Sequence, residues 1–156
     1  MLYFAYGSNL DWQQMKTRCP SASFFCIAML LNYRLEFTHY SDAEHRKCWV
    51  ADIVPDDKEN VWGVVYRLDE VDIGNLDKNE GYKPQRAKNS YLRKEIMVYK
   101  DGNKEFPITA WTYEVMDKIL KNNKTSENYK QQIINGSEFW HLPLDYIKKL
   151  KQIEVS

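Results

Sequence analysis

The chain has 156 residues, of which 44% are hydrophobic and 14% aromatic, and this size suits a single domain over residues 1–156. Its 22 Lys and Arg residues balance 22 Asp and Glu residues, so no global field favours nucleic acid or an anionic membrane surface. No stretch approaches the roughly 20 apolar residues needed to cross a bilayer. Composition therefore argues against nucleic-acid and membrane partners.

The first ten residues run an apolar strand into a small polar turn. Leu2, Phe4 and Ala5 indicate the strand. The turn is Tyr6-Gly7-Ser8-Asn9, in which we expect Gly7 to adopt backbone geometry closed to other residues. Such a junction before a helix points unpaired N–H groups and hydroxyls at one spot, which suits a carboxylate or a polarised carbonyl. An ordinary turn is the alternative, because Gly, Ser and Asn are common turn formers.

A short helix is expected next. Asp11 and Gln14 imitate a capping box, and the helix should end before Pro20. The N-terminus does not resemble a secretory signal, since it has no basic start and its first apolar run is short. The cysteines are odd in number and lack CxxC spacing, so we expect inert thiols in a cytoplasmic protein, with neither disulfides nor zinc. They are Cys19, Cys26 and Cys48.

Four strands are expected in the next part of the chain. Apolar runs and alternation predict strands over Ala22–Asn32 and Arg34–Thr38. Two further strands, Lys47–Val54 and Asn60–Leu68, flank the polar segment 55–59. This arrangement is typical of a hairpin whose turn lies at 55–59.

A helix with a carboxylate near its end follows these strands. Asp69 is placed to cap it, and Gly81 lies where a left-handed terminating residue is wanted. Glu80 falls in the last turn, where the helix dipole disfavours a negative charge and raises the pKa, as a general base requires. A solvent-exposed glutamate is the alternative. Residues 82–89 are charged and contain proline, which suggests an exposed loop.

In the C-terminal part of the chain, the sequence predicts one hairpin and two helices. Tyr91–Tyr99 and Phe106–Val115 form the hairpin around Asp101-Gly102-Asn103. Ser126 precedes a helix that we expect Gly136 to stop, and Leu142-Pro143-Leu144 opens the last helix. About six strands and four short helices imply an α+β fold in which a largely antiparallel sheet curls around the core, as in a small barrel.

Few residues have the spacing of known catalytic machinery. His39, His45 and His141 lie far apart, with no nucleophile at a suggestive spacing, and we expect them to be structural or exposed. His45 and Cys48 fall short of the three or four ligands that a metal site requires, so no metal is expected. Neither GxxxxGK nor GxGxxG occurs among the six glycines.

Four segments, taken in order, resemble the γ-glutamylcyclotransferase family. They are YFAYGSNL at 3–10, NVWGVVY at 60–66, LDKNEG at 76–81 and LPLDY at 142–146. The resemblance continues through PSASFFC at 20–26 and KLKQIE at 149–154, so it spans nearly the whole chain and is greatest to the γ-glutamyl dipeptide enzymes of animal type. It implies a small mixed, mostly antiparallel β-barrel with peripheral short helices.

The resemblance also implies a reaction and a site. The enzyme would convert a γ-glutamyl amide to 5-oxoproline and a free amino acid or amine, without a cofactor. Glu80 matches the family's catalytic acid/base, and Tyr129 matches a substrate-contacting tyrosine. The loop that holds the γ-glutamyl moiety corresponds to Tyr3, Phe4, Ala5, Tyr6, Gly7, Ser8 and Asn9.

The chemistry fits these assignments, because the nucleophile is the substrate's own α-amine. Glu80 would take a proton from an α-ammonium of pKa near ~8 to 9 and return it to the leaving nitrogen. N–H groups near Gly7 and Ser8 would stabilise the oxyanion, and the hydroxyls of Ser8 and Tyr6 would fix the substrate carboxylate. Ring closure gains its speed from orientation, which accounts for a chain without a catalytic Ser, Cys or metal pattern.

Several alternatives stay open. The substrate is a γ-glutamyl dipeptide, a γ-glutamylamine or a γ-glutamyl-protected secondary metabolite, with glutathione disfavoured by the match to the dipeptide branch. A binding module that retained the pocket without turnover is the rival from another class. The segment 82–90 is longer than in animal enzymes, and its Lys83, Arg86 and Lys88 either recruit a substrate carboxylate or lie in a plain exposed loop. A homodimer through exposed aromatic residues is also open.

Overall fold

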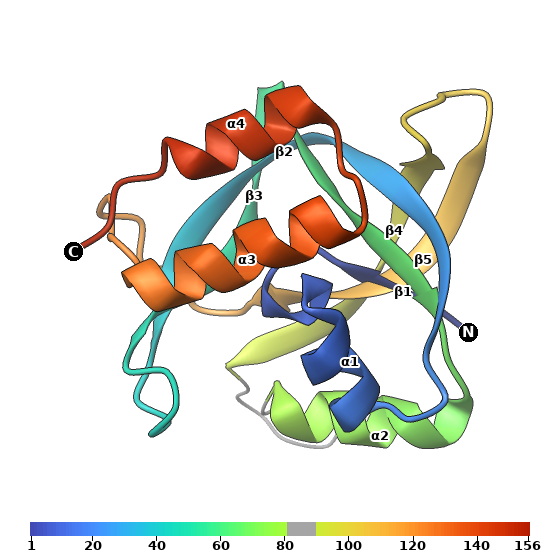
Figure 1. The fold of residues 1–156 in the computed structure, drawn as a ribbon, viewed down its shortest axis with the longest axis horizontal. Coiled ribbons are helices and arrows are strands. Elements are labelled where there is room, and N and C mark those ends of the chain that lie inside the picture. The colour runs from blue at the N-terminus through green and yellow to red at the C-terminus, as the bar shows by residue number, and fades with distance from the viewer. Residues whose placement is uncertain (81–89) are drawn as a thin grey trace.

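Five strands form a closed barrel within residues 1–80 and 90–156, which are the residues that the computed structural model describes (Figure 1). In the order β1-β3-β2-β4-β5 around the barrel, neighbouring strands are antiparallel, except that β1 and β5 run parallel. This confirms the α+β class and the mixed, mostly antiparallel barrel. The strands are β1 (Leu2–Ala5), β2 (Ser23–Ser41), β3 (Cys48–Arg67), β4 (Tyr91–Lys100) and β5 (Pro107–Val115).

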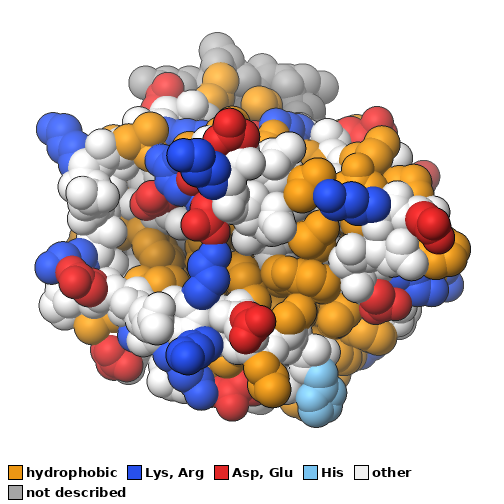
Figure 2. Space-filling model, turned by 90° about the horizontal axis from the view of Figure 1, so that it is seen from above, with side chains coloured by type: hydrophobic (Ala, Val, Ile, Leu, Met, Phe, Trp, Pro, Cys, Tyr) orange, Lys and Arg blue, Asp and Glu red, His pale blue; other side chains and the backbone are white. Residues whose placement is uncertain are grey.

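Short helices cover the outside of this barrel. Figure 1 shows α3 beside α4 and α1 beside α2. In the described part of the chain, no helix is long and apolar enough to cross a membrane. Acidic and basic side chains lie interspersed, with hydrophobic ones between them, on the face seen in Figure 2. The helices are η1 (Ser8–Leu10), α1 (Trp12–Arg18), α2 (Glu70–Asn79), α3 (Glu127–Phe139) and α4 (Leu144–Lys151).

Strands β2 and β3 are longer than the sequence predicted. Each is continuous where two strands were expected, and the real turn between them is the segment 42–47. The predicted turn at 55–59 is wrong: Tyr33 pairs with Pro55 and Leu31 with Asn60, so residues 56–59 of β3 lie opposite the single residue Asn32 of β2. An irregularity of this kind accommodates a polar run without ending the pairing. The expected number of strands therefore falls to five among the described residues.

The short strand β1 closes the barrel. Tyr3 pairs with Tyr66 of β3 on one side and with Trp111 of β5 on the other. Gly63 lets β1 approach, because a Cβ at that position would lie 2.2 Å from the Ala5 carbonyl oxygen. Pairing on both sides therefore fixes the position of β1 and, with it, the start of the polar turn at Tyr6–Asn9.

Most predicted helix starts are confirmed. The Asp11 carboxylate accepts hydrogen bonds from the N–H groups of Gln13 and Gln14, and the Ser126 hydroxyl accepts one from Tyr129 N–H. Helix α2 follows Asp69, although no side-chain hydrogen bond caps it. The expectations for Gly81 and for the loop 82–89, with its Lys83, Arg86 and Lys88, lie outside the described residues.

The structure places the three cysteines in the core, as expected for packing residues, and it confirms the second hairpin. Cys19, Cys26 and Cys48 are buried and free, and burial raises the pKa of the Cys19 thiol to about 12 and that of Cys26 to about 11. These two thiols stay protonated at neutral pH. In the hairpin, β4 pairs with β5 from Tyr91 opposite Val115 onward.

The prediction that Gly136 stops a helix is wrong. Helix α3 continues to Phe139, and a Cβ on Gly136 would lie 2.5 Å from the carbonyl carbon and oxygen of Leu10. Glycine is therefore present because α3 packs directly on the backbone of η1. This contact ties the C-terminal helices to the N-terminal turn.

Substituting Gly136 by alanine should destabilise the protein by about 1–3 kcal/mol, because the added methyl group overpacks a backbone contact. The matched control is Gly74→Ala in α2, where nothing lies within 4 Å of the added Cβ. That change should be neutral or stabilise by up to about 1 kcal/mol. Urea unfolding measures both values, and equal effects of the two substitutions would contradict the packing role of Gly136.

Candidate active site

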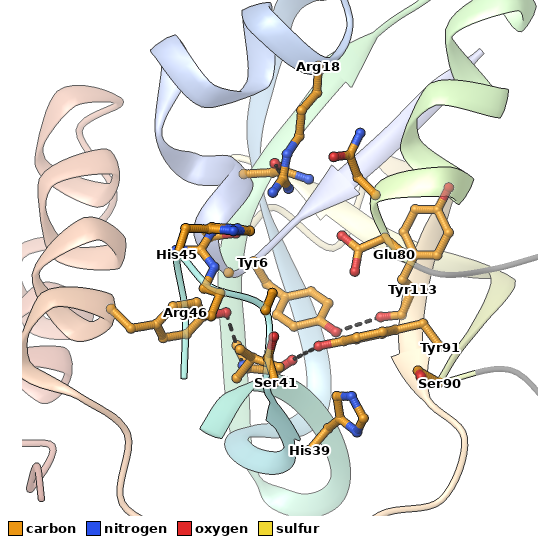
Figure 3. A pocket seen from close by; sticks show the side chains of 18 of the residues that line it. Tyr6, Arg18, His39, Ser41, His45, Arg46, Glu80, Ser90, Tyr91 and Tyr113 are labelled. Atoms are coloured by element: carbon orange, nitrogen blue, oxygen red, sulfur yellow. Dashed lines mark hydrogen bonds between the residues drawn. The ribbon is translucent and has the colours of Figure 1, made fainter. Parts of the chain in front are cut away.

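A cavity of about 300 Å³ opens at one end of the barrel. The N-terminal turn, the β2–β3 turn, the end of α2 and the start of β4 meet there (Figure 3). Seven of the nine residues predicted for the site line this cavity, and two do not. The seven are Tyr3, Tyr6, Gly7, Ser8, Asn9, Glu80 and Tyr129.

Glu80 is the C-cap of α2, and its carboxylate points into the cavity (Figure 3). Burial raises the pKa of this carboxyl to about 7, nearby Asp77 acts in the same direction, and Arg18 and Arg46 oppose the shift. Within residues 1–80 and 90–156, no group donates a hydrogen bond to the carboxylate. The raised pKa follows the predicted direction, but desolvation is its main cause. Both protonation states are therefore populated near neutral pH, which suits proton transfer in either direction.

The two hydroxyls of the N-terminal turn have partners in the protein. Tyr6 donates its hydroxyl proton to the Tyr113 carbonyl oxygen at 2.5 Å, so this donor does not face a ligand. Ser8 Oγ accepts a hydrogen bond from Gln14 Nε2 at 2.9 Å and keeps its own O–H for another partner. The geometry thus favours Ser8 over Tyr6 for a polar contact with a ligand.

Gly7 allows close packing at the base of the turn. Its φ is −115°, so the expected special backbone geometry is not a left-handed one. A Cβ there would instead lie 3.2 Å from the Ala51 Cβ and 3.4 Å from the Tyr129 hydroxyl. The first hydrogen bond of η1 is donated by the Leu10 N–H group to the Gly7 carbonyl oxygen. The N–H groups of Ser8 and Asn9 belong to the first turn of this helix, where N–H groups have no partner within the helix.

Tyr129 reaches the cavity from α3. Its hydroxyl accepts a hydrogen bond from Ala51 N–H at 3.0 Å, and burial raises its pKa to about 12. The Arg46 guanidinium lies over its ring, 5.0 Å from the centroid. Tyr129 therefore stands beside the N-terminal turn, as the predicted contact with substrate requires.

Phe4 and Ala5 do not line the cavity. Phe4 is fully buried, Ala5 is 1% exposed, and both belong to the core of the barrel. The Phe4 carbonyl accepts a hydrogen bond from Thr112 Oγ1 at 2.8 Å. These two residues support the turn that follows them, and the structure places them in the core beneath the cavity rather than in its lining.

The structure adds residues to the site that the sequence did not indicate. The additions include two arginines, two histidines and two tyrosines: Arg18, Arg46, His39, His45, Tyr91 and Tyr113. Burial lowers the pKa of His39 and that of His45, which favours the neutral form of both. Arg18 ends a predicted helix and His45-Arg46 lies in a polar turn, so neither carries a local signal of function. Only closure of the barrel brings them together.

Buried hydrogen bonds fix the wall next to Glu80. The Tyr113 hydroxyl donates to Asp77 Oδ1 at 2.5 Å, and Arg93 pairs with the same carboxylate at 3.1 Å. Tyr91 donates to the Ala51 carbonyl oxygen at 3.1 Å. No cluster of three or more His, Cys, Asp or Glu side chains suited to a metal ion occurs in the described parts of the chain. The titratable and charged groups that line the cavity include the Glu80 carboxyl and the guanidinium groups of Arg18 and Arg46.

Comparisons with known proteins find relatives over nearly the whole chain. The AIG2-like family matches residues 60–150. The chain is 36% identical to human gamma-glutamylcyclotransferase over 156 residues, which covers 98% of this chain and 78% of the human protein. It is 35% identical to the Bos taurus gamma-glutamylcyclotransferase with the same coverage. A solved structure titled gamma-glutamyl cyclotransferase superposes with a TM-score of 0.88 at 33% identity, covering 100% of this chain and 89% of that one.

The raised pKa of Glu80 predicts a pH-dependent stability. Between its ordinary value of 4.5 and about 7, the folded protein holds a proton that the unfolded chain has lost, so stability falls as pH rises through this window. Glutamine does not titrate in this range, so Glu80→Gln removes this fall in stability with pH. The free energy of unfolding of the variant minus that of the wild type should therefore increase by roughly 1–3 kcal/mol when the pH rises from 4.5 to 8.

Urea unfolding at the two pH values measures this difference. Glu70→Gln, at the exposed start of the same helix, is the matched control and should show no such gain. A gain that is absent in Glu80→Gln, or equal in both variants, would contradict the desolvation of Glu80.

Proposed function

The chain belongs to the AIG2-like family, and we propose from this and its gamma-glutamylcyclotransferase relatives that it cyclises γ-glutamyl compounds. It converts a γ-glutamyl amino acid or amide to 5-oxoproline and the free amino acid or amine. The observation that carries the site assignment is one cavity that holds both the N-terminal turn and the carboxyl of Glu80, whose pKa is about 7.

Glu80 moves the proton in this proposal. Its carboxylate takes a proton from the substrate α-ammonium, and the freed amine attacks the γ-carbonyl carbon. The bond between that carbon and the amide nitrogen then breaks, and the proton passes from Glu80 to the leaving nitrogen. The ring nitrogen gives its remaining extra proton to the Glu80 carboxylate, which releases it to solvent before the next turnover. A group of pKa about 7 serves both steps at neutral pH, because neither of its forms is scarce.

The N-terminal turn holds and polarises the γ-glutamyl group. N–H groups near Gly7 and Ser8 stabilise the oxyanion that forms on the γ-carbonyl oxygen. The Ser8 hydroxyl and the Arg18 guanidinium bind the α-carboxylate. Arg18 is anchored there by a hydrogen bond from Nη1 to Asn9 Oδ1 at 3.0 Å, which uses one of its five donors.

Two alternatives differ in the leaving group or in turnover. A γ-glutamylamine or a γ-glutamyl-protected secondary metabolite would need the same γ-glutamyl contacts, so the turn does not distinguish them. A binding module without turnover would gain nothing from a desolvated carboxyl, since burying Glu80 without a hydrogen bond from the described residues is unfavourable. This cost favours the enzyme.

Further proposals concern the whole protein. We place it in the cytoplasm as a single domain over residues 1–156, with no cofactor and with small γ-glutamyl compounds as its ligands. A homodimer is supported by exposed aromatic side chains: Phe24 is 44% and Phe139 57% exposed, and both pack on Trp140 with ring centroids 4.7 Å apart.

Replacing Glu80 by Gln should lower kcat for 5-oxoproline release by about 10² to 10⁴-fold, because the amide keeps the shape but cannot accept the proton. Chromatographic detection of 5-oxoproline from a panel of γ-glutamyl compounds measures this loss. Ligand-induced thermal stabilisation should persist in the variant, and Glu70→Gln should keep wild-type turnover. Equal turnover by Glu80→Gln and the wild type would remove Glu80 from the mechanism, whereas ligand binding without product in the wild type would favour the binding module.

The pH dependence of kcat/KM should be bell-shaped. Its rising limb reports ionisation of Glu80 in the free enzyme, with an apparent pKa of about 7. Its falling limb reports loss of the substrate's α-ammonium proton near ~8 to 9. Initial rates between pH 5 and pH 10 measure the profile, and a rising limb centred near the ordinary glutamate value would contradict a desolvated base.

A further inference from the structure

The cavity is electrostatically asymmetric. Glu80 lies on one side, and His45 and Arg46 lie across from it, with Arg18 above (Figure 3). Neither guanidinium has a carboxylate partner among the described residues, whereas Arg34 and Arg93 both form ion pairs. Two cations that face a cavity without a carboxylate partner in the described protein indicate an anionic ligand.

Arg46 is held in place by neutral groups. Its Nη1 donates to Gln132 Oε1 at 2.8 Å and its Nη2 donates to Gln14 Oε1 at 2.9 Å. Its guanidinium also lies over the Tyr129 ring. Amide oxygens and an aromatic face orient a guanidinium without neutralising it, and the two hydrogen bonds use two of its five donors. As far as the described residues are concerned, its charge and three N–H groups are therefore left for another partner.

The side-chain amides that hold Arg46 also connect to the N-terminal turn. Gln14 Nε2 donates to Ser8 Oγ at 2.9 Å and to Asn9 Oδ1 at 3.0 Å. Gln132 Nε2 donates to Gln14 Oε1 at 2.9 Å. This network fixes the position of Arg46 relative to the turn that receives the γ-glutamyl group, which is a condition for selective recognition.

We propose that Arg46 is a specificity-determining residue that binds a carboxylate on the leaving group. The inference rests on the proposed cyclisation and adds to it the residue that recognises the leaving group: Arg46 would distinguish a leaving group with a carboxylate from one without. A γ-glutamyl amino acid carries two carboxylates. Arg18, bonded to Asn9, is placed for the α-carboxylate, and Arg46, over the Tyr129 ring and across the cavity from Glu80, is placed for the carboxylate of the departing amino acid.

Two substrates that differ only in this carboxylate test the proposal. γ-Glutamyl-alanine and γ-glutamyl-ethylamine share every other group, and 5-oxoproline release gives kcat/KM for each. The wild type should prefer γ-glutamyl-alanine by about 10- to 100-fold, the range for a hydrogen bond to a charged group. Comparable kcat/KM values for the two compounds in the wild type would overturn the proposal without any variant.

Arg46→Gln assigns the preference to this residue. The variant should lower the ratio of kcat/KM for γ-glutamyl-alanine to kcat/KM for γ-glutamyl-ethylamine by about 10- to 100-fold, mainly through KM for γ-glutamyl-alanine, because the effect of Arg46 on the pKa of Glu80 acts on both substrates alike and cancels in the ratio. Lys47→Gln removes one charge from the same turn, where Lys47 is 59% exposed and pairs with Glu44, and should retain the wild-type preference. An equal loss with both substrates would show that Arg46 only supports the fold and would overturn the proposal.

Two further outcomes keep the test decisive. If Arg46→Gln does not fold, Arg46→Lys replaces it: the charge stays but the planar fork is lost, so the preference should shrink, and an unchanged preference would count against the proposal. If the wild type releases 5-oxoproline from neither compound nor from the wider panel, the proposed function fails and the inference fails with it. Equal release from both compounds overturns the inference alone.

Discussion

Closure of the barrel by β1 is the constraint on which the site depends. This four-residue strand pairs with β3 on one side and β5 on the other, and Gly63 makes room for it. Because β1 is paired on both sides, its position is fixed, and the turn that follows it at Tyr6 lies at the open end of the barrel. Helix α2 leaves the end of β3 and returns Glu80 to the same opening. Two distant segments thus become one site.

The electrostatics of the cavity follow from this enclosure. Burial raises the pKa of Glu80, and Arg18 and Arg46 restrain the shift. The tyrosines of the wall stay neutral, since burial also raises the pKa of Tyr91 and of Tyr129. The result is one titrating carboxyl group opposite fixed positive charge. A zwitterionic substrate with an additional carboxylate matches that arrangement, because its ammonium and its anionic groups face opposite partners.

Local features of the fold could be predicted from the sequence, whereas features that depend on register or packing could not. The capping residues Asp11 and Ser126 have short-range signatures and were identified correctly. The polar residues 56–59 have the composition of a turn. Only the pairing of β3 with β2 shows that they form an irregularity within a strand. Gly136 likewise has the signature of a helix stop, but the backbone of Leu10, far away in the sequence, accounts for it.

The same distinction holds for the candidate site. Glu80 and the turn were predicted because they carry a local pattern and match a family, and the structure brings both to one cavity, whereas Phe4 and Ala5 lie in the core. Arg18 and Arg46 were missed because cations in a helix end and a polar turn are ordinary surface features. Their role in the cavity emerges only once the β2–β3 turn, α1 and α3 lie together.

An isotope experiment tests the central claim, that the substrate's own amine is the nucleophile in this cavity. γ-Glutamyl-alanine labelled with ¹⁵N at the α-amine of its glutamyl group is converted in H₂¹⁸O, and the products are analysed by mass spectrometry. Cyclisation predicts 5-oxoproline that retains ¹⁵N in its ring and contains no ¹⁸O, together with unlabelled alanine. Glutamate that carries ¹⁸O in its γ-carboxylate would show attack by water instead and would contradict the account.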